Sequence, residues 1–123
     1  MKNLKFRVWD NRPNKFNYFD LTNIAGNLPS DCIDNVQQFT GAKDRRGVEI
    51  YQGDILLFEM PEVDGSFYRV RFQVVWCDFN NGWALAQQNG KSLQHTGWKF
   101  YQADDSTVVG NVFETPNLLN ESV

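Results

Sequence analysis

A chain of 123 residues has the size of one compact domain, and a content of 41% hydrophobic and 15% aromatic residues excludes a wholly disordered protein. The net charge of −3 argues against a protein that grips nucleic acid over its whole surface, because such binding depends on basic side chains that neutralise phosphates. No apolar run approaches the ~18 residues of a membrane helix and no secretory signal follows Met1, so we expect a cytoplasmic protein with no membrane contact.

Two segments near the N-terminus, residues 4–9 and 15–20, are rich in aromatic and β-branched residues and predict a β-hairpin within residues 1–20. Pro13 and its flanking asparagines favour the connecting turn. Because successive side chains of a strand alternate between faces, Phe6 lies on one face while Arg7 and Trp9 lie on the other. An isolated two-stranded hairpin is only marginally stable, so this one must pack on the rest of the chain or on another copy.

Residues 21–35 are mostly Asn, Gly, Pro, Ser and Asp, which predicts a long loop. Ser30 could cap a single helical turn over residues 30–33. The change in composition makes this loop the expected hinge between the N-terminal hairpin and a main β body over residues 36–114.

The chain is organised around residues 38–57, in which short strands are separated by turns. Residues 44–47 form one turn signal and Gly53 with Asp54 forms a second, followed by the buried-strand pattern of residues 55–58. We interpret Asp44 and Asp54 as acids that bond turn backbone, in preference to a catalytic pair. The residues of this stretch with expected structural roles are Gly41, Asp44, Gly47, Tyr51, Gly53 and Asp54.

A turn at residues 60–65 precedes the longest strand pattern, residues 66–76, where apolar and polar residues alternate. The face expected to enter the core holds Tyr68, Val70, Phe72, Val74 and Trp76. Arg69 and Arg71 alternate with these residues, so we expect both arginines to face solvent.

The remaining chain continues the β pattern. Residues 83–87 predict a strand, and Asn89 with Gly90 favours a two-residue hairpin loop after it. Residues 97–101 and 107–113 predict two more strands around a polar break at residues 104–106. Pro116 after Thr115 fits the first position of a helical turn over residues 115–120. Many short strands without a long helix predict an all-β fold, either a small barrel or a sandwich.

Three separated segments resemble the YopX family of small phage and prophage proteins. Residues 5–10, KFRVWD, resemble its opening K-F-R-x-W-D, and residues 40–55 follow its T-G-x-x-D-x-x-G-x-x-I-Y-x-G-D-I pattern. Residues 109–119, which include Gly110 and Pro116, resemble its closing I-G-N-I-x-E-x-P-x-L-L. The resemblance implies one YopX-like domain over residues 1–123, an SH3-like β roll elaborated by extended hairpins, and a bacterial host cell; it implies no particular biochemical activity.

Residues that carry chemistry are sparse. His95 is the one histidine and Cys32 and Cys77 are far apart in sequence, so no zinc-ligand spacing exists. We expect reduced thiols, with a disulfide as the alternative, and we interpret Cys77 as an inert buried thiol in preference to the nucleophile of a pair with His95. No phosphate-binding glycine motif is present. We therefore expect no catalytic residue, no cofactor and no metal.

A binding role is the function that the composition favours, because the aromatic residues exceed what a small core hides. We expect a protein-binding or self-associating module: a homo-oligomer, or a protein that binds a host or phage protein. The alternative is a single-stranded nucleic-acid binder, which would stack bases on aromatics beside arginines, and an enzyme ranks third. The candidate binding surface comprises Trp9, Arg45, Arg46, Arg69, Arg71 and Trp98.

Overall fold

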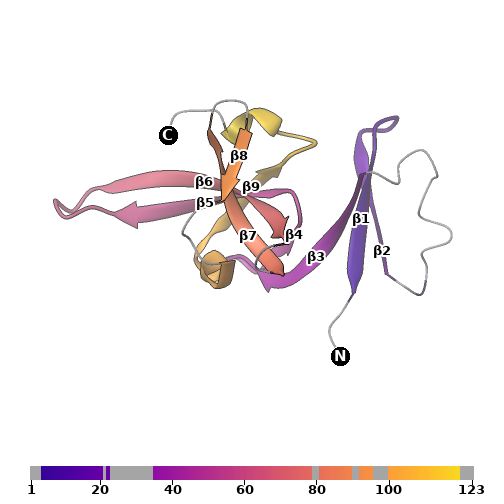
Figure 1. The fold of residues 1–123 in the computed structure, drawn as a ribbon, viewed down its shortest axis with the longest axis horizontal. Coiled ribbons are helices and arrows are strands. Elements are labelled where there is room, and N and C mark those ends of the chain that lie inside the picture. Colours follow the sequence, from indigo (N-terminus) through magenta and orange to yellow (C-terminus); the bar gives the residue numbers. More distant parts are fainter. Residues whose placement is uncertain are drawn as a thin grey trace.

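The computed structural model describes residues 4–20, 22, 35–78, 81–89, 92–95 and 100–119. They form two antiparallel sheets, with strand orders β2-β1-β3-β4 and β8-β7-β6-β5-β9 (Figure 1). The strands are β1 (Lys5–Asp10), β2 (Lys15–Asp20), β3 (Val36–Lys43), β4 (Glu49–Tyr51), β5 (Asp54–Pro61), β6 (Phe67–Cys77), β7 (Gly82–Asn89), β8 (Ser92–His95) and β9 (Thr107–Asn111). Two short 3-10 helices, η3 (Phe100–Asp105) and η4 (Pro116–Leu119), accompany them.

The predicted mainly-β class is confirmed, whereas a closed SH3-like barrel is not. Each sheet runs from one edge strand to another, β2 to β4 and β8 to β9, so neither closes on itself. The main core lies on the five-stranded sheet and is built from Ile50, Leu56, Phe58, Phe72, Val74, Leu85 and Ala103. A smaller cluster of Val8 and Phe19 holds β1 against β2.

The predicted strand at residues 97–101 is wrong where the structure describes it. Phe100 and the residues after it form η3, and the fully buried Ala103 packs in the main core with Phe100 beside it. Residues three apart share one face of a 3-10 helix, so the apolar pattern here has the helical period and not the period of a strand. Ser106 ends the helix by donating its backbone N–H and its hydroxyl to the Ala103 carbonyl, at 3.0 and 2.6 Å.

The N-terminal hairpin packs on its own chain. β1 pairs with β2 from Lys5 opposite Asp20 to Asp10 opposite Lys15, and its other edge pairs with β3. Most of the expected hinge, residues 21–35, lies outside the described residues, as does the helical turn expected at residues 30–33. The hairpin therefore extends the first sheet and does not require a second copy for its packing.

The alternation predicted for β6 holds only in the middle of the strand. Phe72 and Val74 are buried, but Tyr68 and Trp76 are 47% and 44% exposed and do not enter the core. Arg71 also differs from the prediction, because it is half-buried and donates from Nη1 to the Leu118 carbonyl of η4 at 3.2 Å. The middle of β6 packs in the main core, whereas the side chains of Tyr68 and Trp76 near its two ends lie outside that core.

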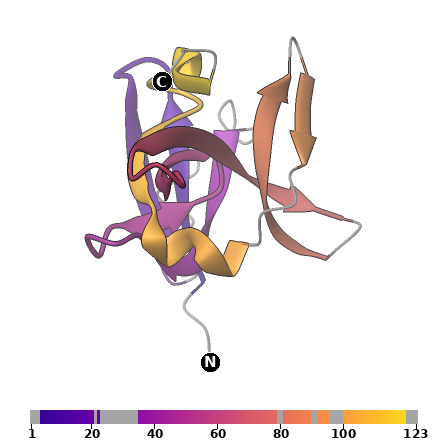
Figure 2. The ribbon, with the colours of Figure 1, turned by 90° about the vertical axis from the view of Figure 1, so that its left-hand side faces the viewer.

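A two-stranded ribbon projects from the second sheet. β9 pairs with β5 only as far as Leu57, and β7 pairs with β6 only from Gln73 onward, whereas β5 and β6 continue to pair until Pro61 lies opposite Phe67. Residues 58–70 thus form an arm, which Figure 1 shows at the left, away from the N-terminal hairpin. In Figure 2 the arm points toward the viewer.

Candidate functional site

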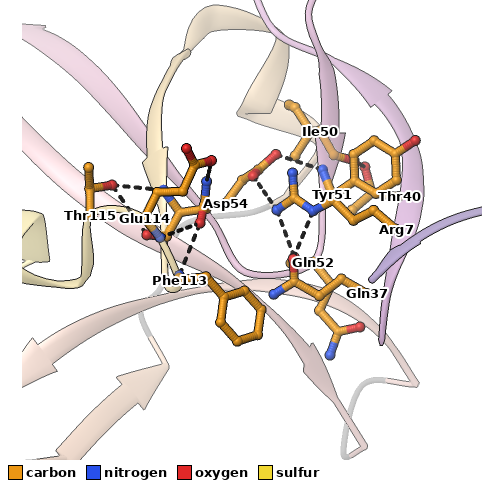
Figure 3. Close-up of polar contacts among 11 residues, drawn as sticks. Arg7, Gln37, Thr40, Ile50, Tyr51, Gln52, Asp54, Phe113, Glu114 and Thr115 are labelled. Atoms are coloured by element: carbon orange, nitrogen blue, oxygen red, sulfur yellow. Dashed lines mark hydrogen bonds and ion pairs between the residues drawn. The ribbon is translucent and has the colours of Figure 1, made fainter. Parts of the chain in front are cut away.

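The three motifs that are far apart in sequence meet where the two sheets join. β1 contributes Arg7, and β5 contributes its first residue, Asp54 (Figure 3). The end of β9 contributes Asn111, which lies opposite Asp54 in the sheet. Arg7 Nη2 lies 2.6 Å from Asp54 Oδ1, and Asp54 Oδ2 accepts the Tyr51 backbone N–H at 2.8 Å. The strand order places Arg7 in the first sheet and Asp54 in the second, so their ion pair links the sheets.

The Arg7 guanidinium donates hydrogen bonds along its edge and contacts aromatic rings through its faces. Its Nε donates to Gln37 Oε1 at 2.8 Å, and Nη2 also reaches the Gln52 carbonyl at 3.4 Å. The Phe16 and Tyr51 rings lie 4.1 and 4.8 Å from the guanidinium carbon, which gives two cation–π contacts. Since the Arg7 and Asp54 side chains are only 6% and 2% exposed, loss of either would leave the other buried without its counter-charge.

Burial shifts the pKa of two groups in this cluster, Asp54 and Tyr51. Burial raises the pKa of Asp54, while the Arg7 guanidinium and the Tyr51 N–H act in the opposite direction. Burial, together with the negative charge of Glu49, raises the pKa of Tyr51 to about 12, so its phenol is protonated at neutral pH. A cavity of about 390 Å³ lies beside these groups, lined in part by Tyr18, Tyr51 and Asn111.

Asp44 makes the turn hydrogen bonds that its place in the sequence suggests, and one more. Its Oδ1 accepts the N–H groups of Arg46 and Val48 at 2.8 and 2.9 Å within the turn, and its Oδ2 accepts the N–H of Val108 in β9 at 2.9 Å. Burial opposes ionisation, but the three donors outweigh it and hold the pKa of Asp44 below its ordinary value. This carboxylate therefore fastens the turn to a distant strand.

The C-terminal motif is a compact turn. Asn111 Oδ1 accepts the N–H groups of Phe113 and Glu114, both at 2.9 Å, and Asn111 Nδ2 donates to Glu114 Oε1 at 2.8 Å. A side chain at Gly110 would overlap Thr115 and Leu118, so this glycine permits the turn to pack on β9. Pro116 begins η4, at the position that its sequence context suggests.

Of the two tryptophans expected on the binding surface, the structure describes only Trp9, which is buried. Trp9 is only 6% exposed, and its ring stacks on Phe113 at 5.6 Å and meets Phe16 edge-on at 4.9 Å. Trp98 lies outside the described residues, as does the side chain of His95, whereas Cys77 is buried. The turn after β9 places Phe113 against the Trp9 ring, and this neighbour is more than 100 residues away, so no local pattern reveals it.

The four expected surface arginines have different surroundings. Arg45 is exposed, and Arg46 donates from Nη2 to the Val108 carbonyl at 3.2 Å. Arg69 lies 3.6 Å from Glu59 across the arm, and Arg71 is held at η4. The structure thus does not gather these arginines into one solvent-facing stripe.

Sequence reasoning missed the apolar surface of the arm. Val63 at its tip is fully exposed and Phe67 is 66% exposed, next to the half-exposed Tyr68. Beside the arm lies a groove of about 620 Å³, lined by Arg45, Phe58, Glu59, Met60, Pro61, Gln102 and Asp105. The signal for it in the sequence is the long apolar alternation of β6, but the alternation does not show where the neighbouring strands end.

Residues 22–120 match the family model described as YopX protein. A solved structure similar to this chain is the crystal structure of protein EF1440 from Enterococcus faecalis, with a TM-score of 0.62 and 25% sequence identity over 97% of this chain and 99% of that one. No curated protein matches the sequence. Within the described part of the chain, no helix is long and apolar enough to span a membrane.

Proposed function

The chain belongs to the YopX protein family, and on that premise we propose that it is a non-catalytic module that binds protein through the β5–β6 arm. The observation that supports this proposal most strongly is the exposure of Val63, Phe67 and Tyr68. They lie on the β5–β6 ribbon, which projects beyond its neighbouring strands β9 and β7. A two-stranded ribbon is marginally stable alone, and exposed apolar residues that gather on one element are typical of a protein contact. The family resemblance also supports a phage or prophage product in a bacterial cytoplasm.

The polar groups support a structural role for the acids of the central motif. Asp44 receives three backbone N–H groups, and Asp54 receives the Tyr51 N–H together with the Arg7 guanidinium. A general base needs a lone pair directed at its substrate. Both acids direct their oxygens at groups of their own chain, which favours binding over catalysis.

The arm replaces the N-terminal hairpin as the reason to expect a protein partner. β1 and β2 already pack within the chain, so their aromatic side chains do not call for a second copy. The nucleic-acid alternative loses support from the positions of Arg69 and Arg71, since the first pairs with Glu59 and the second bonds η4.

The proposal is tested by placing the photo-crosslinking residue p-benzoylphenylalanine at position 67, where the native residue is Phe67, in cells of a bacterial host. Because the ring at this position is exposed, ultraviolet light should yield a covalent adduct that protease degrades and nuclease does not. Adducts are read by electrophoresis and mass spectrometry.

The matched control carries the same residue at position 18, where Tyr18 is also exposed, at 57%, but lies in the first sheet. Protein adducts at position 67 and none at position 18 support an arm-based contact. No adduct at position 67, or an adduct that nuclease removes, overturns the proposal.

A further inference from the structure

We propose that the arm binds a second copy of this chain, so that the arms of two copies lie antiparallel about a two-fold axis and each tip reaches the other's groove. This inference rests on the proposed function and names its partner. It is carried by three features of one chain: an acidic tip, an apolar arm, and a groove with an exposed cation beside the base of the arm.

The groove forms where β5 extends beyond the end of its pairing with β9. Leu57 is the last β5 residue that pairs with β9, opposite Thr107, and the next residues of β5 line one wall of the groove. Arg45 of the β3–β4 turn and Gln102 and Asp105 of η3 line the remainder. The wall from β5 is largely apolar, whereas the rest is polar and carries both signs of charge.

The tip of the arm is acidic. Glu62 and Asp64 are exposed, and the next basic residue along the chain is Arg69, which lies near Glu59. The turn at the base of the arm has the opposite character, because Lys43 and Arg45 are exposed there. The acidic tip of one copy therefore attracts the basic turn of the other copy. Because each copy carries both features, the same attraction acts twice in a dimer.

The place of the groove decides the symmetry. Because it lies beside the base of the arm, two arms packed antiparallel bring each tip to the other copy's groove, and the same contact forms twice. The exposed Tyr68 and the partly buried Met60, opposite each other in the ribbon, then lie in the middle of the contact. Pro61 has no N–H to extend a β-ladder, so side chains carry the contact.

Two acids that line the groove, Glu59 and Asp105, oppose the contact, although Glu59 already lies near Arg69. Asp105 lines the same groove as Arg45, and its carboxylate repels an incoming acidic tip. The arrangement therefore predicts opposite effects for these two side chains: removal of the positive charge of Arg45 weakens the dimer, and removal of the negative charge of Asp105 strengthens it.

The test measures the mass of the purified full chain by sedimentation equilibrium from 1 to about 100 µM, a range that covers micromolar association. We expect Arg45→Glu and Glu62→Lys each to raise the dimer dissociation constant about tenfold, since each reversal affects two contacts. The double variant should return to within about threefold of the original value, and Asp105→Asn should lower it. Arg45 and Glu62 hydrogen-bond Ser106, Ser66 and Gly65 through their backbone atoms, so these side-chain changes leave those bonds in place.

Lys15→Glu is the matched control, because Lys15 is an exposed cation of the N-terminal hairpin, and its reversal should leave the constant unchanged. A monomer over the whole range, a mass above a dimer, or a double variant as weak as the single variants overturns the inference. Protein adducts at position 67 combined with a monomeric mass would overturn only the second copy as partner, whereas the absence of adducts would overturn the binding module itself.

Discussion

Two glycines with nearly equal backbone angles separate the effect of conformation from that of packing. Gly47 and Gly53 have φ of +85° and +86°, but an added side chain meets open space at the first and overlaps the Gln37 amide at the second. Gln37 is buried and bonded to Arg7, so its amide cannot move aside at low cost.

We predict that Gly47→Ala lowers the free energy of unfolding by about 1 kcal/mol, for the backbone alone. Gly53→Ala should lower it by about 2–4 kcal/mol, because overlap adds to the same backbone cost. Urea unfolding of both variants measures the difference. Equal losses of unfolding free energy in the two variants would show that the Gln37 side chain moves aside and that the overlap at Gly53 costs no stability.

The carboxylate of Asp44 gives a prediction that depends on pH. Asp44→Asn places an amide N–H where an oxygen accepts a backbone N–H, and at pH 7 should cost about 1–3 kcal/mol of unfolding free energy. The pKa of Asp44 is lowered on folding from its ordinary 3.8, so its charge stabilises the fold above that pH and the benefit is lost as the pH falls through the lowered pKa.

In unfolding curves from pH 7 down to about pH 3, the difference between the two proteins should therefore shrink as the pH falls below 3.8. Asp104→Asn, a change at an exposed acid of η3, is the control and should stay close to the original protein throughout. A constant difference between Asp44→Asn and the original protein would contradict the assigned role.

At the level of elements, the buried ion pair between Arg7 and Asp54 helps to join the N-terminal hairpin to the second sheet. Arg7→Met leaves the Asp54 carboxylate buried without its counter-charge and should cost about 3–5 kcal/mol. Adding Asp54→Asn removes that charge while keeping an oxygen for the Tyr51 N–H, so the double variant should regain at least about 1 kcal/mol.

Thermal and urea unfolding of the two variants measure this coupling. Lys15→Gln is the control, because it changes an exposed residue of the same hairpin without placing a second acid opposite Asp10. A loss below about 1 kcal/mol for Arg7→Met would mean that the hairpin contributes little to the second sheet.

For the whole molecule, the distribution of charge separates protein binding from nucleic-acid binding. The net charge is −3, and the arginines on the arm strand are engaged with Glu59 and with η4. Because binding to single strands is led by phosphate neutralisation, we predict no change in tryptophan fluorescence with oligonucleotides up to about 0.1 mM.

The titration is repeated at two salt concentrations and with the Arg69→Ala/Arg71→Ala variant. If oligonucleotides bind tightly and quench the tryptophan fluorescence, and if this binding weakens with salt and is lost in the variant, the nucleic-acid module is favoured instead. Binding that persists in the variant would point to the basic side chains of the β3–β4 turn, Lys43 and Arg45.

The sequence by itself determined the mainly-β class, most strand positions and the turn at Asp44, because these depend on side-chain alternation and on hydrogen bonds within a few residues. Only the tertiary structure decided that Arg7 pairs with Asp54, that Trp9 is covered by Phe113, and that Tyr68 is exposed. Burial depends on which distant strands lie alongside and where each of them ends. A local pattern specifies which face of a strand is apolar, but the neighbouring strands determine how much of that face is covered.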